Sequence, residues 1–166
     1  MSPSRTTRGL GFVSDLVPID LPGYAADVLH CELPVTAKAA RTARTKLRQY
    51  LATQPTTTGQ DNAELILTEL VANAVTASVG ADADADTGAG AGAGAGAIRL
   101  VAQLVAGELL IEVFDESPGM PRPRLADDFA EDGRGLLLIE QLSTAWGWHP
   151  APGGKVVWAV PKTDAA

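Results

Sequence analysis

A carboxylate and an amide oxygen stand one helical turn apart in the stretch LILTELVANAVTAS, residues 65–78. An α-helix turns by about 100° per residue, so Glu69 and Asn73 share one face and border the apolar stripe that contains Ile66 and Leu70. Burying a bare carboxylate is costly, so Glu69 needs a strong partner or a cavity to line. We therefore expect the pair at the edge of a site. The alternative is an ordinary solvated Glu and Asn beside a core stripe.

A second acidic residue, Asp115, ends the stretch LLIEVFD and is followed by a turn through Ser117 and Pro118. In a strand, side chains alternate between faces, so Asp115 shares the core-facing side with Leu109, Ile111 and Val113. A carboxylate on that side needs a hydrogen-bond donor, such as the amino group of a nucleobase. The alternative is an Asx-turn that closes the following loop.

A pair of glycines, Gly133 and Gly135, flanks Arg134 where the apolar stretch GLLLIEQLS begins. The first backbone N–H groups of a helix have no partner within it and attract anions, phosphates above all. No Gly-Lys-Ser/Thr follows, so the motif is not a P-loop. The alternative is a plain junction between a loop and a helix.

The rest of the chain supplies the elements that must position these groups. Hydrophobic patterning predicts strands at 27–34, 98–106, 109–115, 145–150 and 155–161, and helices at 35–52, 61–78 and 133–143. The second helix is expected to start at Asp61 as N-cap, with Glu64 completing a capping box. Two-residue turns are expected at 107–108 and 153–154. Residues 1–22 are expected to form a flexible tail, 23–162 one domain, and 80–97, rich in Gly, Ala and Asp, a mobile loop.

Composition narrows the class of protein. The chain has 166 residues, 46% of them hydrophobic, which suits a single core. A net charge of −7 argues against direct binding to nucleic acid or to an anionic membrane. Cys31 is the only cysteine and there are two histidines, which excludes a disulfide framework and a Cys/His zinc site. No apolar run is long enough to span a membrane, so a cytoplasmic location is expected.

In this order and spacing, the motifs ELVANA (69–74), DESPG (115–119) and GRGL (133–136) resemble those of the Bergerat-type, or GHKL, ATP-binding fold of histidine kinases, gyrases and heat-shock chaperones. The resemblance is closest to the small bacterial anti-sigma-factor serine/threonine kinases. The ending GKVVWA fits the same family, and the resemblance covers about residues 26 to 161. It implies an α/β two-layer sandwich, with a mixed, mainly antiparallel sheet and helices on one face.

The resemblance also implies roles for individual residues. Asn73 would bind the magnesium ion that accompanies ATP, and Glu69 would be the general base that activates the attacking hydroxyl. Asp115 would accept from the adenine amino group, with Gly119 letting the backbone pass close to the base. The segment Gly133–Leu136, which includes Arg134 and Gly135, would bound the phosphates.

Two functions are left open by these motifs. The first is ATP-dependent phosphorylation of a serine or threonine in an anti-sigma-factor antagonist of the STAS type, with or without binding of a sigma factor. The second is a non-catalytic module of the same fold that acts only through a protein partner. Members of the family commonly dimerise, so a homodimer is a further expectation from the resemblance.

Overall fold

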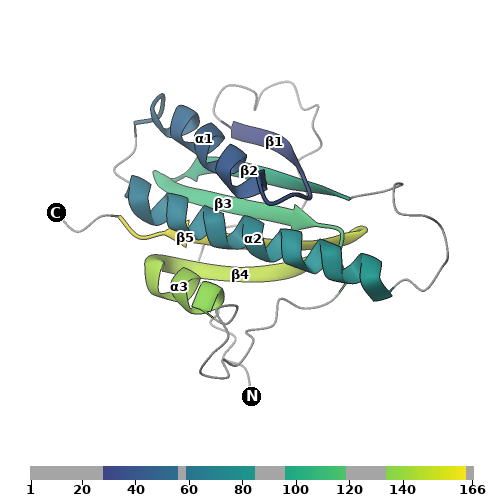
Figure 1. Ribbon diagram of the computed structural model, residues 1–166. Helices are drawn as coiled ribbons and strands as arrows, with labels where there is room; N and C mark the ends of the chain where they lie inside the picture. The colour runs from purple at the N-terminus through teal and green to yellow at the C-terminus, as the bar shows by residue number, and fades with distance from the viewer. Residues whose placement is uncertain (1–27, 56–58, 85–95, 119–133, 164–166) are drawn as a thin grey trace, which may run out of the picture.

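The computed structural model describes residues 28–55, 59–84, 96–118 and 134–163, and shows one sheet with helices on one of its faces (Figure 1). The elements in chain order are β1 (Val28–Pro34), α1 (Ala39–Leu51), α2 (Gln60–Asp84), β2 (Ala97–Val105), β3 (Glu108–Asp115), α3 (Arg134–Leu142), β4 (Ser143–Ala151) and β5 (Gly154–Pro161). The expected two-layer α/β sandwich is confirmed.

The sheet has five strands in the order β1-β2-β3-β5-β4, and each of the four neighbouring pairs is antiparallel. Strand β5 thus lies between β3 and β4, although it follows both of them along the chain. The turn between β2 and β3 is Ala106-Gly107, one residue earlier than the sequence predicts, and both residues have positive φ angles of 52° and 86°. Positive φ at both central residues is the mark of a type I′ hairpin turn, which matches the twist of the strands.

The core lies between the helices and the side of the sheet that faces them. On β1, Leu33 is buried and Leu29 and Cys31 pack against the core, whereas His30 and Glu32 are exposed, as the alternation predicts. The predicted stripe of the first helix is also confirmed, because α1 buries Ala39, Ala43, Leu47 and Leu51. Helix α2 lies across the middle of this layer and contacts both other helices and strands β2, β3 and β5 (Figure 1).

The bounds of α2 differ from the prediction at both ends. The helix extends to Asp84, so the predicted loop does not begin at residue 80; a helix that is already formed adds further residues easily, and Ala81 and Ala83 favour this. At the other end the helix starts at Gln60, and the Glu64 carboxylate accepts from Arg48 and from the Gln60 side chain. The predicted capping box is therefore wrong, because a guanidinium from α1 is a stronger donor than a backbone N–H.

Several predictions fall on residues outside the described ranges. The predicted tail at 1–22 and most of the predicted loop at 80–97 lie there, and the domain limits of 23–162 stay a prediction. Among the helices that the structure describes, none combines the length and the hydrophobicity that crossing a bilayer requires.

Candidate functional site

Helix α2 holds Glu69 and Asn73 at the edge of its buried stripe. The stripe consists of small and branched apolar side chains that are almost fully buried: Ala63, Ile66, Leu67, Leu70, Val71 and Ala74. Glu69 and Asn73 are half-buried, and Ala72 beside them is exposed. The pair therefore borders the core, as the helical spacing predicts. Because the stripe fixes the rotation of α2 about its axis, it also fixes the direction in which both side chains project.

The first turn of α3 comes directly against this pair. A Cβ atom added to Gly135 would lie 2.6 Å from Oε2 of Glu69 and 3.6 Å from Oδ1 of Asn73. The first distance is shorter than any real Cβ contact, so the absence of a side chain at Gly135 permits the approach. Two motifs more than sixty residues apart along the chain therefore meet at one point. A carboxylate, an amide oxygen and the beginning of a nine-residue helix lie there together.

The other residues of the glycine motif are placed less fully. Arg134 begins α3, and Gly133 lies outside the described residues. Leu136 is buried and belongs to the hydrophobic core, so only its backbone is available to a ligand at the helix tip. The side chain of Leu136 instead anchors α3 to the rest of the domain.

Asp115 lies at the end of β3 and is almost fully buried, at 1% exposure. Leu109, Ile111 and Val113 on the same side of the strand are buried too, so the predicted parity is confirmed. The backbone N–H of Ser117 donates to Oδ1 of Asp115 at 3.0 Å, which is the Asx-turn that the sequence left open as an alternative. The Ser117 hydroxyl also donates to Oδ1. Gly119, the predicted neighbour of the base, lies outside the described residues.

The strongest partner of Asp115 is Lys155 on the adjacent strand β5, whose Nζ donates to Oδ1 of Asp115 at 2.8 Å. The side chains of the two residues are 7% and 2% exposed, so this is a buried ion pair. The sequence interpretation gave Lys155 no role. A signal was present, because Lys155 shares the core-facing side of its strand with Val157 and Ala159. A lysine on that side needs a buried anion nearby.

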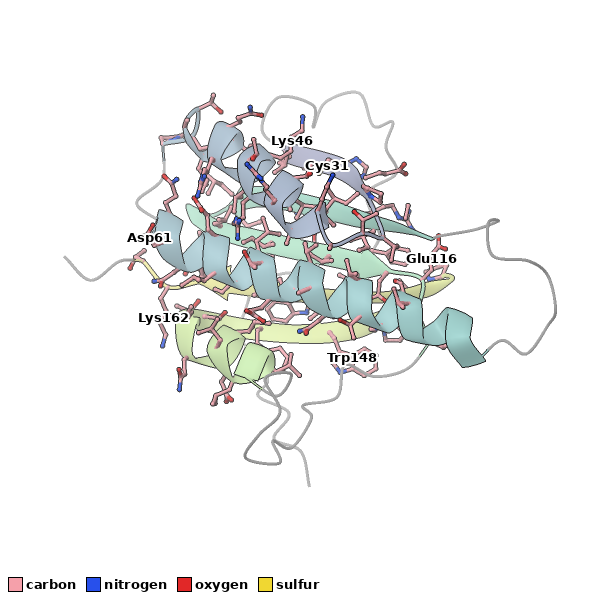
Figure 2. The ribbon with its side chains drawn as sticks, viewed as in Figure 1. Cys31, Lys46, Asp61, Glu116, Trp148 and Lys162 are labelled. Carbon is pink, nitrogen blue, oxygen red and sulfur yellow. The ribbon has the colours of Figure 1, made fainter. Side chains whose placement is uncertain are left out.

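The candidate site lies on the helix-covered side of the sheet. In Figure 2, Asp61 marks the N-terminal end of α2, and Glu116, the neighbour of Asp115, lies at the far end of the sheet beside the C-terminal half of that helix. The same view places Trp148 of β4 alongside α2, and this indole packs against the core. Glu69 and Asn73, midway along α2, lie between these two ends.

The model of the histidine kinase-like ATPase domain matches residues 33–160, which is most of the chain. This chain belongs to that family. The matched range includes Glu69 on α2, Asp115 on β3, Gly135 on α3 and Lys155 on β5. A search of curated proteins finds no match. This histidine kinase-like ATPase domain is thus an ATP-binding regulatory domain of the GHKL type, and such domains bind ATP, generally with Mg²⁺.

The polar side chains at the site of this histidine kinase-like ATPase domain suit a magnesium ion that binds together with a nucleotide. Within the described residues, no group of three or more His, Cys, Asp or Glu side chains could hold a metal ion by itself. Asn73 offers an amide oxygen, the hard ligand type that Mg²⁺ prefers, and Mg²⁺ keeps several waters and binds phosphate oxygens. One protein oxygen next to a helix tip is therefore an adequate donor set.

An ion pair between helices holds α2 of this histidine kinase-like ATPase domain in place. Nε and the terminal nitrogen Nη2 of Arg48 on α1 donate to the two oxygens of Glu64 on α2, at 2.6 and 2.5 Å. The hydrogen bond from Arg48, followed by one from Gln60, holds the pKa of Glu64 below its usual value, although burial opposes this. The geometry is bidentate, which is the orientation-specific form of a carboxylate–guanidinium contact. Glu64 lies about one and a half helical turns before Glu69, so the contact helps to orient that part of the helix.

Glu112 lies on the opposite side of β3 from the site. Burial raises the pKa of its carboxyl, and the charge of His149 on β4 partly opposes that rise. Glu112 pairs across the sheet with Trp158 of β5. It therefore belongs to the side of the sheet that the helices do not cover, and it takes no part in the cluster at Glu69 and Asn73.

Proposed function

We propose that this chain is an ATP-dependent serine/threonine kinase that acts on an anti-sigma-factor antagonist of the STAS type, with or without binding of a sigma factor. The family membership supports ATP binding and a regulatory role. The closest motif resemblance, to the anti-sigma-factor kinases, supports the substrate class. A cytoplasmic location and a homodimer follow from that resemblance as parts of the proposal.

A single observation carries the catalytic part of the proposal. A Cβ atom on Gly135 would lie within 3.6 Å of both Oε2 of Glu69 and Oδ1 of Asn73, so a base, a ligand for a cation and a phosphate-attracting helix tip are within one small volume. Phosphoryl transfer needs little beyond positioning and charge stabilisation, and these three groups supply both. An ordinary surface Glu and Asn have no need of a glycine packed against them.

Each residue then has a role in the transfer. Oε2 of Glu69 accepts the proton of the attacking serine or threonine hydroxyl, and the free N–H groups at the start of α3 bind the phosphate oxygens. Oδ1 of Asn73 is the protein ligand for Mg²⁺, which neutralises the negative charge of the triphosphate when it is bound. Asp115 accepts from the adenine amino group at the other end of the nucleotide.

The second candidate function is that of a non-catalytic binding module. Measurements of ATP binding and of phosphate transfer distinguish it from the kinase. Thermal unfolding is measured with and without ATP and Mg²⁺, for the original protein and for Asn73→Ala. A ligand at about one hundred times its Kd stabilises a protein by about 2.7 kcal/mol, which the original protein should show and Asn73→Ala should lose. An unchanged melting temperature in the original protein would refute ATP binding.

Transfer itself is tested with γ-labelled ATP and the STAS-type proteins encoded in the same genome. Label should appear on a serine or threonine of one of them, and Glu69→Ala should abolish it while still binding ATP. A ligand-induced rise in melting temperature without transfer to any such protein would favour the binding module.

A further inference from the structure

The contacts around Asp115 converge on one of its two oxygens. Oδ1 accepts from the Ser117 backbone N–H at 3.0 Å, from the Ser117 hydroxyl and from Nζ of Lys155 at 2.8 Å. The second oxygen, Oδ2, takes no part in these three contacts. A carboxylate has about four lone-pair positions, two on each oxygen. Oδ1 is therefore fully used, and a further donor has to bind at Oδ2.

The ammonium group of Lys155 is fully used as well. Its Nζ donates to Oδ1 of Asp115, to the Ser117 hydroxyl and to the Ser117 carbonyl oxygen at 3.4 Å. An ammonium group has three N–H donors and no acceptor. Lys155 consequently has no donor left for a ligand, and any effect it has on ligand binding acts through Asp115.

The backbone prevents this cluster from shifting. A Cβ atom added to Gly154, the residue before Lys155, would lie 2.0 Å from the carbonyl oxygen of Asp115, so the two strands are in close backbone contact there. The register pairs Asp115 directly with Lys155. Both side chains are almost fully buried, so the loss of one partner would leave the other charge unpaired in a largely desolvated position.

We propose that Lys155 is a positioning residue for nucleobase recognition: together with Ser117 it holds Oδ1 of Asp115, so that Oδ2 is presented to the amino group of the base. This proposal rests on the proposed function, in which Asp115 is the acceptor for adenine. The ion pair of Asp115 and Lys155 has no net charge. The uncharged amino group of adenine can therefore bind to Asp115 without leaving an unpaired charge buried beneath the base.

The test compares ATP with purine riboside triphosphate, which lacks only the amino group that Asp115 would bind. The Kd of each nucleotide, with Mg²⁺, is measured by calorimetry for the original protein and for Lys155→Met. The original protein should prefer ATP at least tenfold, because an unpaired buried acceptor is penalised. In Lys155→Met, ATP should bind about tenfold more weakly while purine riboside triphosphate stays within about twofold, so that the preference is lost.

A matched control is Lys162→Met, which removes the exposed lysine just beyond the other end of β5, where Nζ donates to the Gln141 carbonyl oxygen. This variant should keep both affinities and the preference. Should Lys155→Met fail to fold, Ser117→Ala removes one donor to Oδ1 and leaves the ion pair in place; it should lower the preference about threefold.

The outcomes separate this inference from the proposed function. Equal loss of affinity for both nucleotides in Lys155→Met would show that Lys155 only stabilises the fold, and tighter ATP binding would show that it competes with the base; either result overturns the inference. Failure of the original protein to bind either nucleotide would overturn the proposed function, and this inference with it.

Discussion

Substituting Gly135 by alanine tests whether the approach of α3 to Glu69 matters for the chemistry. The new methyl group would lie 2.6 Å from Oε2 of Glu69, against about 3.4 Å for the closest ordinary contact, so the carboxylate has to move by about 0.8 Å. The atom in the way is the end of a flexible side chain, so it can move without displacing the backbone. The substitution therefore acts on the position of Glu69, and only weakly on the fold.

The expected effects on stability and on activity differ in size. Replacing Gly by Ala in a helix gains up to about 1 kcal/mol, and forcing Glu69 from its rotamer costs about as much, so the free energy of unfolding should change by less than about 1 kcal/mol. A misplacement of about 1 Å at a reacting group lowers the rate about a hundredfold. Phosphoryl transfer from labelled ATP should fall by that factor, whereas the Kd of ATP should change less than tenfold.

Two further variants decide the interpretation. Leu137→Ala changes an exposed residue on the same helix and should leave both stability and transfer unchanged. In a Glu69→Gln background, Gly135→Ala should add little to the loss, because both changes act on the same group. Full transfer activity in Gly135→Ala, or an equal additional loss in the double variant, would refute the reasoning.

Three other predictions concern the framework around the site. Burial raises the pKa of Glu112, so the stabilising protonated form is lost as the pH rises through that pKa. Glu112→Gln should therefore raise the melting temperature at pH 8, and should have little effect below about pH 4. Because the hydrogen bond from Arg48 lowers the pKa of Glu64, the ionised Glu64 carboxylate stabilises the fold above about pH 4.3, and this stabilisation is lost as the pH falls further. In urea unfolding at pH 3–6, the free energy of unfolding should therefore depend less steeply on pH in Arg48→Met. Ala106 has a φ of 52°, so Ala106→Gly should raise the free energy of unfolding by about 0.5–1 kcal/mol, and a decrease would show that the turn carries no strain.

Local patterns in the sequence were sufficient for the parts of the site that lie within one element. The helical-wheel projection of α2 predicted that Glu69 and Asn73 border the core. The alternation of side chains along β3 predicted that Asp115 faces the core. Both predictions are confirmed. These predictions need only the periods of a helix and a strand. The role of each residue stays a prediction that the experiments above address.

Contacts between elements that are distant along the chain could not be predicted from local sequence patterns. The pairing of Asp115 with Lys155 depends on β5 lying beside β3, and nothing in the spacing of the two residues specifies that order. Similarly, Glu64 was expected to cap its own helix because the partner on α1, Arg48, is sixteen residues away. The hairpin turn was misplaced by one residue because an alanine, Ala106, takes a backbone conformation that usually belongs to Gly or Asn.

The position of β5 between β3 and β4 has a consequence for how the protein is made. When residues 1 to 150 have left the ribosome, β3 still has an open edge, and Asp115 lacks its partner Lys155. Strand β5, from Gly154 onward, closes that edge and brings Lys155 beside the carboxylate. A nascent chain should therefore be unable to capture nucleotide until the final strand has emerged, and until then its exposed strand is the part most open to pairing with other chains.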